Sequence, residues 1–521
     1  GTRLEFKIFN ILAQSLVEDQ KRIDILLEKP DSKLISIVPA PCVDIVHDIF
    51  DHIHIIAPSI VYPLENIPLI IRIHDTYKNL VKDFTGALQL KLNDKIIPLQ
   101  FDAQYHGFLK LYAPAFSSEG TYTLSIAYND MVFYSNPMVC REHKKSKKLY
   151  WGYIHGHTLK SDGIRSIEEY FENMIKAGLD FGTATEHDHL WETTDKDFEE
   201  IKKIVKDATK VNEFISLFGY EYGTWYTGYG DICIYYEDEE LPIFRSEINK
   251  FNSTNKLIQN LTPFKGDLMM IAHHTALRPG YRNWDVFNNE LEKLVESYST
   301  WGNQEYPSSE GNPLPPRYKF FGYGPYAKKR GPILEKKGSF VQDALAKGYK
   351  LGFTAGGDDH FGIYPSGMID PDNGIYPPGI MAIWAETLTK ESIWNAMQNR
   401  KCYGTTGPRV IVELYVDEYF MGDIINIQDK QEFEKKRTIR INLLSPIKIL
   451  KLELIRNNKI LKEIAINHTD YAIQIQDLEL FDNICLKHSQ ENEFFTFYYL
   501  RIFLDENHMA WSSPIWIIKT L

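Results

Sequence analysis

The period of the hydrophobic pattern changes twice along this chain, and no other sequence feature limits the possible folds so strongly. Between residues 53 and 139, short apolar runs of period two follow one another, for example at 69–73 and 122–128, with turn residues between them. Runs spaced by roughly ten residues are typical of a β-sandwich. From 149 to 409 apolar runs alternate with amphipathic helical segments, and after 410 the period of two returns. We therefore predict a multidomain fold, α/β in the centre and all-β at both ends.

The predicted domain boundaries lie where these patterns change. Residues 1–148 are expected to form an immunoglobulin-like β-sandwich with a leading segment and a charged linker at 141–148, which we interpret as a solvated connection. Residues 149–409 form the predicted α/β domain, and residues 410–521 form a second β-sandwich. A chain of 521 residues agrees with this division, because domains usually contain roughly 100–200 residues.

The composition excludes several classes of protein. With 44% hydrophobic and 25% charged residues, the chain is neither disordered nor fibrous. Its net charge of −12 argues against a nucleic-acid-binding surface. The five cysteines form no C-x-x-C pair, so we interpret them as core residues or free thiols. No apolar run reaches the roughly 18 residues of a spanning helix, which predicts a cytoplasmic protein without a membrane partner, or one whose leader has been removed.

Helices and strands alternate inside the central segment. Ser166 and Glu169 form a capping box, which predicts a helix that begins there and ends near Gly178. Three more amphipathic segments are predicted helices, at 198–208, 340–347 and 391–399. The apolar runs between them are predicted strands, at 214–218, 268–272, 351–354 and 380–385. This order indicates a mostly parallel sheet or barrel, with functional residues where the strands end.

Histidines and carboxylates gather at these strand ends. The first pair, His155 and His157, lies two apart on an extended segment, so both imidazoles point to the same side and can approach one ion. The later strand ends carry His187 and His189, then Glu221, then His273 and His274, and finally Asp358 and His360. Charged and imidazole side chains avoid the core unless they are paired or bind a metal. We therefore interpret these residues as a metal site rather than as surface decoration.

The ligand types limit the choice of metal. Histidine nitrogen and carboxylate oxygen without a thiolate favour zinc, manganese or iron. The candidate ligands exceed the shell of one ion, so we expect two or three divalent ions, bridged by a carboxylate such as Glu221. Ions about 3.5–4 Å apart activate water and bind both oxygens of a displaced ester.

The order and spacing of these motifs resemble the PHP (polymerase and histidinol phosphatase) family of metallohydrolases over roughly residues 149–407. The segments that carry the resemblance are His155-x-His157, Ser161-Asp162-Gly163, 166–170, 177–181, 185–188 and 357–360. Segments 403–407 and 510–516 are similar to a PHP-like group whose catalytic domain lies between two β-sandwiches. The resemblance implies a distorted (β/α)7 barrel that holds up to three metal ions and hydrolyses phosphate monoesters or diesters.

The resemblance also implies a ligand set. Carried over motif by motif, the metal ligands are His155, His157, Asp162, His187, Glu221, His273, Asp358 and His360. His273 fits the expected strand end better than His274, which could then contact the substrate. Where the family has another histidine, this chain has Asp231, in the sequence Gly-Asp-Ile-Cys. As an oxygen ligand Asp231 would shift the preference towards manganese or iron; otherwise the third ion is absent, or Asp231 caps a turn.

Substrate contacts are predicted beside these motifs. Five basic residues could hold a phosphate, although each also fits an ordinary surface charge: Lys160, Arg165, Arg278, Arg282 and Arg409. Tyr226, in an aromatic stretch after Glu221, could stack on a sugar or base, or pack as a lid. Glu296, Trp301 and Glu305 are expected at the pocket rim, and His274 or His189 is the predicted acid for the leaving group. The expected partner is a phosphorylated small molecule.

Two other functions stay open at this point. The same metals could hydrolyse an amide or a lactone, because a bimetallic site also polarises a carbonyl. Alternatively, the chain is a non-enzymatic protein whose β-sandwiches bind a glycan or a partner, with a degenerate barrel between them. The nearly complete ligand set counts against that last function.

Overall fold

A computed structural model describes residues 14–520 except for 24, 29–33, 37, 93–94, 143–146, 224–229, 239, 279, 317–333 and 363–375. The chain divides into two compact units. The first contains Gly1–Ile55, Ile71–Lys110 and Ser125–Phe133, and the second contains Ile56–Ile70, Leu111–Leu124 and Tyr134–Leu521. Among the described residues, no helix has both the length and the apolar composition needed to cross a membrane.

Strands dominate the N-terminal part of the chain. One sheet has the order β10 (Phe108–Ala113), β7 (Ile67–His74), β5 (His52–Ile56), and another has the order β13 (Met131–Tyr134), β12 (Ser125–Tyr128), β8 (Gly86–Leu92), β9 (Lys95–Phe101). Two strand pairs precede them, β1 (Glu18–Arg22) with β4 (Cys42–Ile45) and β2 (Leu26–Glu28) with β3 (Leu34–Ser36). In β8, Leu88, Leu90 and Leu92 are buried while the residues between them are exposed, which is the period-two pattern that the sequence predicts.

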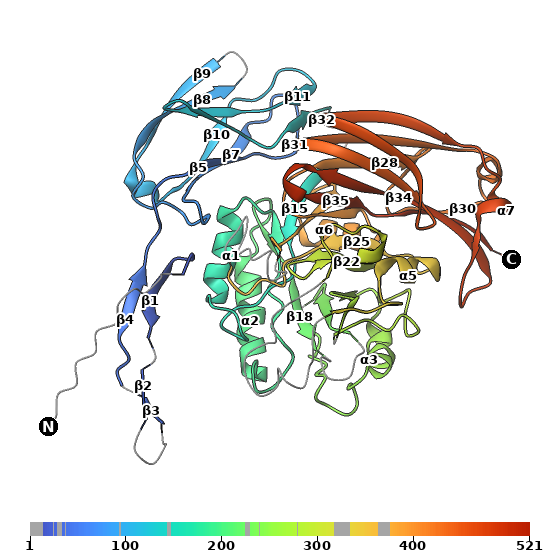
Figure 1. Cartoon of the computed structure of the whole chain (residues 1–521), viewed down its shortest axis with the longest axis horizontal. Helices are drawn as coiled ribbons and strands as arrows, with labels where there is room; N and C mark the ends of the chain where they lie inside the picture. The colour runs from blue at the N-terminus through green and yellow to red at the C-terminus, as the bar shows by residue number, and fades with distance from the viewer. Residues whose placement is uncertain are drawn as a thin grey trace. The chain divides into compact units, whose positions relative to one another are not determined.

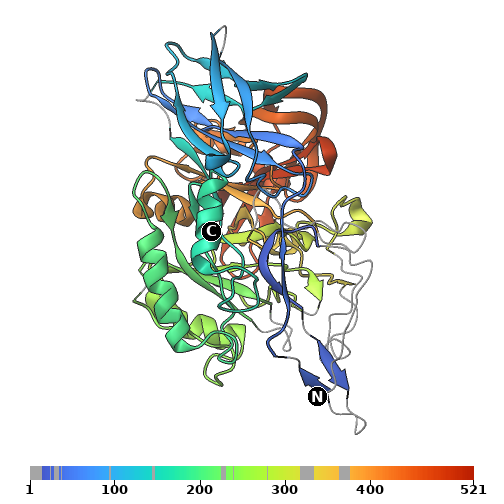
Figure 2. The ribbon, with the colours of Figure 1, turned by 90° about the vertical axis from the view of Figure 1, so that its left-hand side faces the viewer.

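The second unit contains the predicted strand–helix repeat. Strands β15 (Lys148–Tyr153), β16 (Phe181–Gly182) and β17 (Ile215–Ser216) are parallel neighbours. Helices α1 (Ile167–Lys176) and α2 (Asp195–Ala208) connect them and pack side by side (Figure 1 and Figure 2). The Ser166 hydroxyl accepts a hydrogen bond from the Glu169 amide at the start of α1, and Thr194 with Asp197 forms a capping box at the start of α2. Local capping therefore places both helix starts.

The end of α1 depends on a glycine and an arginine. Gly178 has a φ of +66°, the left-handed conformation in which helices commonly end. A Cβ at this position would lie 2.7 Å from Cγ2 of Ile56. The guanidinium of Arg409 donates to the carbonyls of Ala177 at 3.1 Å and Gly178 at 2.6 Å. Arg409 thus satisfies carbonyls that the helix itself leaves without a donor.

Asp180, which follows this helix end, predicts a pH dependence of stability. Burial raises the pKa of Asp180 from 3.8 to about 6, although Arg409 and the Trp151 amide oppose the change. The folded protein therefore binds this proton more tightly than the unfolded chain, so the group costs stability as the pH rises from about 4 to 6. Asparagine carries no such proton, so the stability of Asp180→Asn relative to the natural chain should increase by about 1–2 kcal/mol when the pH is raised from 4 to 7. This figure is smaller than the full pKa change gives, because Asp180 is partly exposed to solvent. Urea unfolding of both proteins at the two pH values measures this, and a stability difference independent of pH would contradict it.

The remaining strands of the central segment run in both directions. Strands β18 (Phe218–Tyr222), β19 (Ile232–Tyr236) and β20 (Leu268–Ala272) are antiparallel neighbours, whereas β20, β22 (Leu294–Ser299) and β25 (Gly352–Ala355) are parallel. Strand β26 (Ile380–Ala385) is antiparallel to both β15 and β27 (Cys402–Thr405). The pairing is therefore mixed rather than mostly parallel. Only residues 223–231 separate β18 from β19, fewer than the dozen or so that a parallel crossover needs, so this connection is antiparallel.

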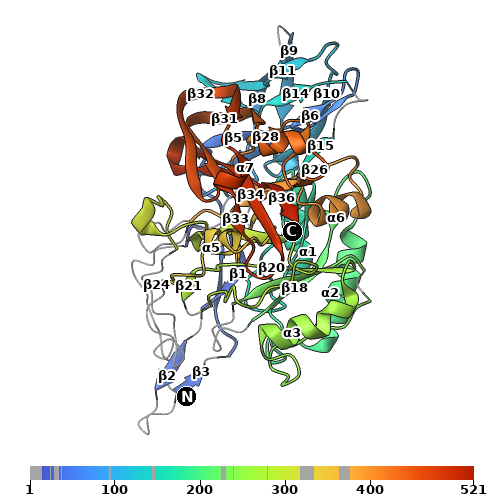
Figure 3. The same cartoon turned by 90° about the vertical axis from the view of Figure 1, so that its right-hand side faces the viewer.

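The chain after residue 410 is built mainly from strands. They are β28 (Ile411–Val416), β31 (Arg437–Arg456), β32 (Lys459–Asp477), β34 (Glu493–Leu504), β35 (Met509–Ser512) and β36 (Ile515–Thr520). The long β31–β32 hairpin and β34 form much of the orange-to-red part of the ribbon (Figure 3). Strand β35 pairs with β27, so these strands continue the sheet that contains β15 and β26. Strands on both sides of the expected domain boundary near residue 410 therefore belong to one sheet. The division into three domains stays a prediction.

Shorter elements complete the described chain. The strands among them are β6 (Ile60–Val61), β11 (Gly120–Tyr122), β14 (Met138–Cys140), β21 (Leu277–Arg278), β23 (Gly302–Asn303), β24 (Leu334–Glu335), β29 (Tyr419–Phe420), β30 (Ile424–Asn426) and β33 (Leu486–Lys487). The helices are α3 (Thr254–Leu261), α5 (Val341–Ala346), α6 (Lys390–Gln398) and α7 (Phe481–Ile484). Helices α5 and α6 match two predicted segments closely, whereas α3 was not predicted, since its short pattern holds few apolar residues.

Candidate metal centre

His155 and His157 lie just beyond the end of β15. Their backbone pairs with a segment far away in the sequence: the His157 amide donates to the carbonyl of Asp359 (2.8 Å), and the Asp358 amide donates to the carbonyl of His155 (3.0 Å). Gly156 allows this close approach, because a Cβ there would lie 2.2 Å from the hydroxyl of a neighbouring tyrosine. Both imidazoles are fully buried. The strand pairing thus brings the first histidine motif beside the last acidic motif.

Glu221, near the end of β18, is the centre of the site. Its backbone forms a bridge with His187, so the segment that follows β16 meets the end of β18 here. Its Oε1 lies 2.8 Å from Nε2 of His273. Its Oε2 lies 3.1 Å from Nε2 of His157, 3.4 Å from Nδ1 of His187 and 3.7 Å from Nε2 of His155. One buried carboxylate therefore faces four imidazoles, and its two oxygens point to different ones.

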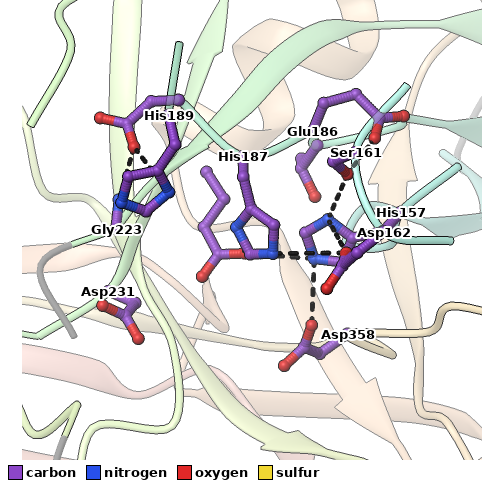
Figure 4. A network of polar contacts seen from close by, with 12 residues as sticks. His157, Ser161, Asp162, Glu186, His187, His189, Gly223, Asp231 and Asp358 are labelled. Atoms are coloured by element: carbon purple, nitrogen blue, oxygen red, sulfur yellow. Dashed lines mark hydrogen bonds and ion pairs between the residues drawn. The ribbon is translucent and has the colours of Figure 1, made fainter. Parts of the chain in front are cut away.

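Possible ligand atoms form overlapping groups in which all atoms lie within 4.8 Å of one another. Three of these groups are His155, His157, Glu221 and Asp358; Glu221, Asp231, His273 and His274; and His157, Asp162, His187 and His360. Figure 4 shows His157, Asp162 and His187 pointing towards one another, with Asp358 next to His157 and Asp231 apart from them at the lower left. Glu221 and His157 each belong to two of the groups. Every metal ligand that the sequence predicts is brought into at least one group.

The first group, His155, His157, Glu221 and Asp358, is held by contacts among its members and by two residues outside it. Nε2 of His157 lies 3.1 Å from Oδ1 of Asp358, and Nε2 of His155 lies 3.5 Å from the same oxygen. Glu296 of β22 contacts the other ring nitrogen of His155 at 3.1 Å, and the indole of Trp301 donates to Oδ2 of Asp358. Outer contacts of this kind orient metal-binding histidines and carboxylates. Asp358 also has a φ of +49°, a strained conformation that clusters at functional sites.

The second group contains Asp231 and the His273–His274 pair. Nε2 of His274 lies 3.6 Å from Oδ2 of Asp231, and Asp231 is fully buried with its carboxylate in the group. Burial and the neighbouring His273 lower the pKa of His274 to about 3, so its imidazole is neutral near pH 7. A neutral imidazole binds metals well but is a poor proton donor. The geometry therefore favours His274 as a ligand over its predicted role as leaving-group acid.

The third group lies closest to solvent. Oδ1 of Asp162 is 3.1 Å from Nε2 of His360, 3.4 Å from Nε2 of His187 and 3.9 Å from Nδ1 of His157. The Asp162 side chain is 49% exposed, whereas His157 is buried. A substrate can therefore approach the groups from the side of Asp162.

Imidazoles and carboxylates set one another's charge in the absence of metal. Burial lowers the pKa of His157, but the carboxylates of Asp358 and Glu221 together outweigh burial and raise that pKa well above 6.5. Burial raises the pKa of Asp358, but His155 and His157 outweigh it and hold the pKa well below its usual value. These proton-bearing imidazoles must lose their protons when they bind a cation, so metal binding should release protons.

His189 lies at the edge of the site, next to Glu192. Its Nδ1 is 3.3 Å from Oε2 of Glu192, and its ring centroid is 6.2 Å from that of His187. Burial lowers the pKa of His189, but Glu192 and Asp188 outweigh burial and raise it. A raised pKa makes an imidazole easier to use as a proton donor near neutral pH. Of the two predicted leaving-group acids, His189 fits that role better.

Most of the predicted phosphate contacts have other partners. Three form ion pairs with carboxylates: Lys160 with Glu200 (2.6 Å), Arg165 with Glu169 (2.7 Å) and Arg282 with Glu292 (2.9 Å). Arg409 caps α1, as described above. These contacts give the four side chains roles in the fold, and their contact with a substrate stays a prediction. Arg278 is exposed at the end of β21, and Tyr226 lies outside the described residues.

Sequence reasoning missed three residues around the ligand groups: Glu186 and Glu296, which support them from outside, and Cys233, which belongs to one. Glu186 accepts hydrogen bonds from the hydroxyls of Thr158 (2.6 Å) and Ser161, and so holds the turn before Asp162. Glu296 touches His155 directly, deeper than the pocket rim where it was expected. The thiol of Cys233 forms a further group of possible ligands with His155 and His273. The sequence did contain a sign of this position. Cys233 lies two residues after Asp231 on an extended segment, so the two side chains project to the same side.

Asp231 gives a testable difference between a ligand and a turn cap. If its carboxylate binds metal, Asp231→Ala should lose about one ion per chain and most of the turnover, and Asp231→His should keep the full metal set with a shift towards zinc. Elemental analysis of the purified variants measures both. Under the turn-cap alternative, Asp231→Ala costs about 1 kcal/mol of stability and keeps its metal. An unchanged metal content in Asp231→Ala would therefore exclude the ligand role.

Comparison with known protein sequences places this chain beside proteins of unknown activity. A family model described as "Protein of unknown function (DUF3604)" matches residues 369–439. An uncharacterized protein of Chlamydia trachomatis serovar D is 28% identical over 483 residues, which cover 91% of this chain and 75% of that protein. A second uncharacterized protein, from Chlamydia pneumoniae, is 26% identical over 483 residues, with the same coverage of 91% and 75%.

Solved structures give only weak matches. A Bacteroides vulgatus crystal structure, described as a two-domain protein containing a predicted PHP-like metal-dependent phosphoesterase, is 14% identical with a TM-score of 0.34, and covers 68% of this chain and 91% of its own. A candidate metal-dependent phosphoesterase from Bifidobacterium adolescentis is 14% identical with a TM-score of 0.23, and covers 43% and 92%. TM-scores this low support no conclusion about the fold or the site. The function is therefore argued from the site itself.

Proposed function

We propose that this protein is a metal-dependent hydrolase that cleaves phosphate esters at a centre of two or three divalent ions. The observation that carries the proposal is the Glu221 carboxylate, whose two oxygens face four imidazoles, three of them fully buried. A buried carboxylate shared between ligand groups is what a bridged metal centre requires. The order of the sequence motifs supports the same proposal, which includes a distorted PHP-type barrel between two β-sandwiches and a phosphorylated small molecule as substrate.

The residues fit divalent zinc, manganese or iron. The three groups offer imidazole nitrogens and carboxylate oxygens, which are the ligands these ions prefer. Buried polar atoms there, such as Nδ1 of His273, make no hydrogen bond within the described residues. Unsatisfied buried polar atoms are costly, and a bound cation would remove that cost. When bound, ions at such a site supply an activated water molecule and stabilise negative charge on the ester.

The chain's own side chains then have distinct tasks. Glu296 orients His155, and Trp301 orients Asp358, so that both keep the geometry needed for binding. His189 at the edge is placed to give a proton to the leaving group, and Glu192 keeps that proton on its ring. The buried surroundings of Glu221 strengthen every electrostatic interaction with the substrate.

A second candidate, hydrolysis of an amide or a lactone at the same site, is favoured by one observation. Four of the five basic side chains expected to bind a phosphate are engaged elsewhere. Within the described residues, the metal ions themselves would then have to offset most of the charge of a phosphate dianion. A substrate of lower charge, such as a phosphodiester or a neutral carbonyl compound, avoids that demand.

A substrate panel with metal analysis tests the proposed function. The full chain would be purified, its metal content measured, and its turnover compared for phosphate monoesters, phosphodiesters, amides and lactones with Mn²⁺, Zn²⁺ or Fe²⁺. We expect about two or more metal equivalents per chain and turnover of the phosphate esters. Turnover of amides or lactones alone would support the second candidate. Less than one equivalent of metal, with no stabilisation by added Mn²⁺ or Zn²⁺, would instead favour a non-enzymatic binding protein.

A further inference from the structure

We propose that the thiol of Cys233 is a ligand of the metal centre, which makes the centre a mixed nitrogen, oxygen and sulfur site selective for zinc over manganese. The inference rests on the proposed metal centre and adds a ligand that the sequence motifs do not contain. A thiolate ligand shifts the metal preference towards zinc, whereas Asp231 alone would shift it towards manganese or iron.

The position of Cys233 follows from strand register. Strand β19 lies between β18 and β20, and Cys233 stands directly opposite Glu221 on one neighbour and Ile271 on the other. Residues directly opposite each other in a sheet project to the same face, so the thiol lies on the face that carries the Glu221 carboxylate. Cys233 is 1% exposed, and His155 and His273 are fully buried.

The thiol and two imidazoles form a group of the size that one ion can bind. The sulfur of Cys233 and one nitrogen each from His155 and His273 lie within 4.8 Å of one another. Two ligands of one tetrahedral zinc ion are about 3.3–3.8 Å apart, from Zn–N distances of about 2.0–2.1 Å and a Zn–S distance of about 2.3 Å. A small movement of side chains therefore brings the three atoms onto one cation.

An independent observation points to a cation-binding position beside Cys233. Nδ1 of His273 is buried and makes no hydrogen bond within the described residues, although Nε2 of the same ring contacts Glu221 at 2.8 Å. Buried nitrogens of this kind nearly always have a partner in native proteins. A cation between Cys233 and these imidazoles supplies one.

The chemistry is simple ligand exchange. The cation loses a water molecule, the S–H bond breaks, a metal–sulfur bond forms, and the proton passes to solvent, so nothing is oxidised or reduced. Thiolate is a soft ligand that favours zinc, whereas carboxylate favours manganese. A serine hydroxyl at the same position is hard and keeps its proton, so Cys233→Ser should move the preference of the centre towards manganese.

Cobalt substitution tests the inference directly, because a Co²⁺–thiolate bond produces a charge-transfer absorption band in the near ultraviolet. Four full-length proteins would be compared after loading with Co²⁺: the natural chain, Cys233→Ser, Cys233→Ala and Cys402→Ser. Cys402 is a matched control, since it is also a buried strand cysteine and its thiol contacts the carbonyl of Phe353 at 3.6 Å. We expect the band in the natural chain and in Cys402→Ser, and its loss in both Cys233 variants.

Competition between Zn²⁺ and Mn²⁺ provides a second readout that does not depend on turnover. In Cys233→Ser, the preference for zinc over manganese should fall about tenfold or more, the usual effect of weakening a contact at a metal site. A natural chain that binds Co²⁺ without the band, or a band that persists in Cys233→Ser, would overturn the thiolate ligand while leaving the proposed hydrolase intact. A natural chain that binds neither Co²⁺ nor Zn²⁺ would instead contradict the metal centre as a whole.

Discussion

Replacing Glu221 by glutamine is expected to reduce turnover about a thousandfold, which corresponds to ~4 kcal/mol of activation free energy. The amide has nearly the same size, but its nitrogen cannot bind a cation, so one of the two carboxylate oxygens that face four imidazoles is lost. The bridged ions should then be bound less tightly, and the purified variant should contain about one metal equivalent less than the natural chain. Elemental analysis and steady-state kinetics on the preferred ester measure the two effects separately.

The matched control for this change is Glu199→Gln on the exposed side of α2. Glu199 pairs with Lys202 at 2.9 Å and its side chain is 73% exposed. The same chemical change at this surface position should leave metal content and turnover unaltered. Natural metal content and natural turnover in Glu221→Gln would refute the central role of this carboxylate.

The second large effect is expected at Glu305, which was predicted at the pocket rim and is buried against strands β34 and β35. Glu305 is fully buried and accepts hydrogen bonds from Arg501 (2.6 Å), Tyr499 (2.6 Å) and Trp511 (2.7 Å). Glu305→Ala leaves the buried guanidinium with one carboxylate partner, Glu453, and leaves two further donors without an acceptor. We expect a loss of about 3–5 kcal/mol in the free energy of unfolding, measured by urea denaturation.

A surface carboxylate on β32, in the sheet that contains β34, separates this effect from ordinary ion-pair loss. Glu463 pairs with Lys451 at 3.0 Å, but its side chain is 54% exposed. Glu463→Ala should cost less than about 1 kcal/mol, because water screens and replaces the interaction. Equal losses in the two variants would show that burial of the Glu305–Arg501 pair contributes nothing special. Arg501 belongs to β34 and Glu305 to the segment after β22. The comparison of the two variants therefore also tests whether contact with that segment stabilises β34.

Local patterns predicted a good part of this structure. Helix α1 begins at Ser166 and ends at Gly178, as the capping residue and the glycine indicate, because both signals act within a few residues of the backbone they control. The alternation in β8 is equally local. His155 and His157 lie on one side of an extended segment for the same reason, and residue type predicts the kinds of metal that they could bind.

Strand direction could not be read from those patterns. The apolar runs of β18, β19 and β20 look alike whether their neighbours are parallel or antiparallel, because period and composition describe one strand at a time. Connection length carries some information, and the short segment 223–231 was the available sign of an antiparallel pair. The continuous pairing of β27 with β35 also has no local signal, since it joins segments more than a hundred residues apart.

The assignment of single side chains divides along the same line. Which residues could bind a metal followed from their chemistry and their place at strand ends. Which atoms meet depends on contacts between distant segments: Asp358 reaches His155 and His157 through backbone pairing, and Cys233 joins them through its register with Glu221. Long basic side chains are the least predictable, because a flexible arginine such as Arg409 binds whichever acceptors the folded chain brings within its reach, here the end of α1. Composition and periodicity are properties of neighbours in sequence, whereas ligand sets and ion pairs are properties of neighbours in space.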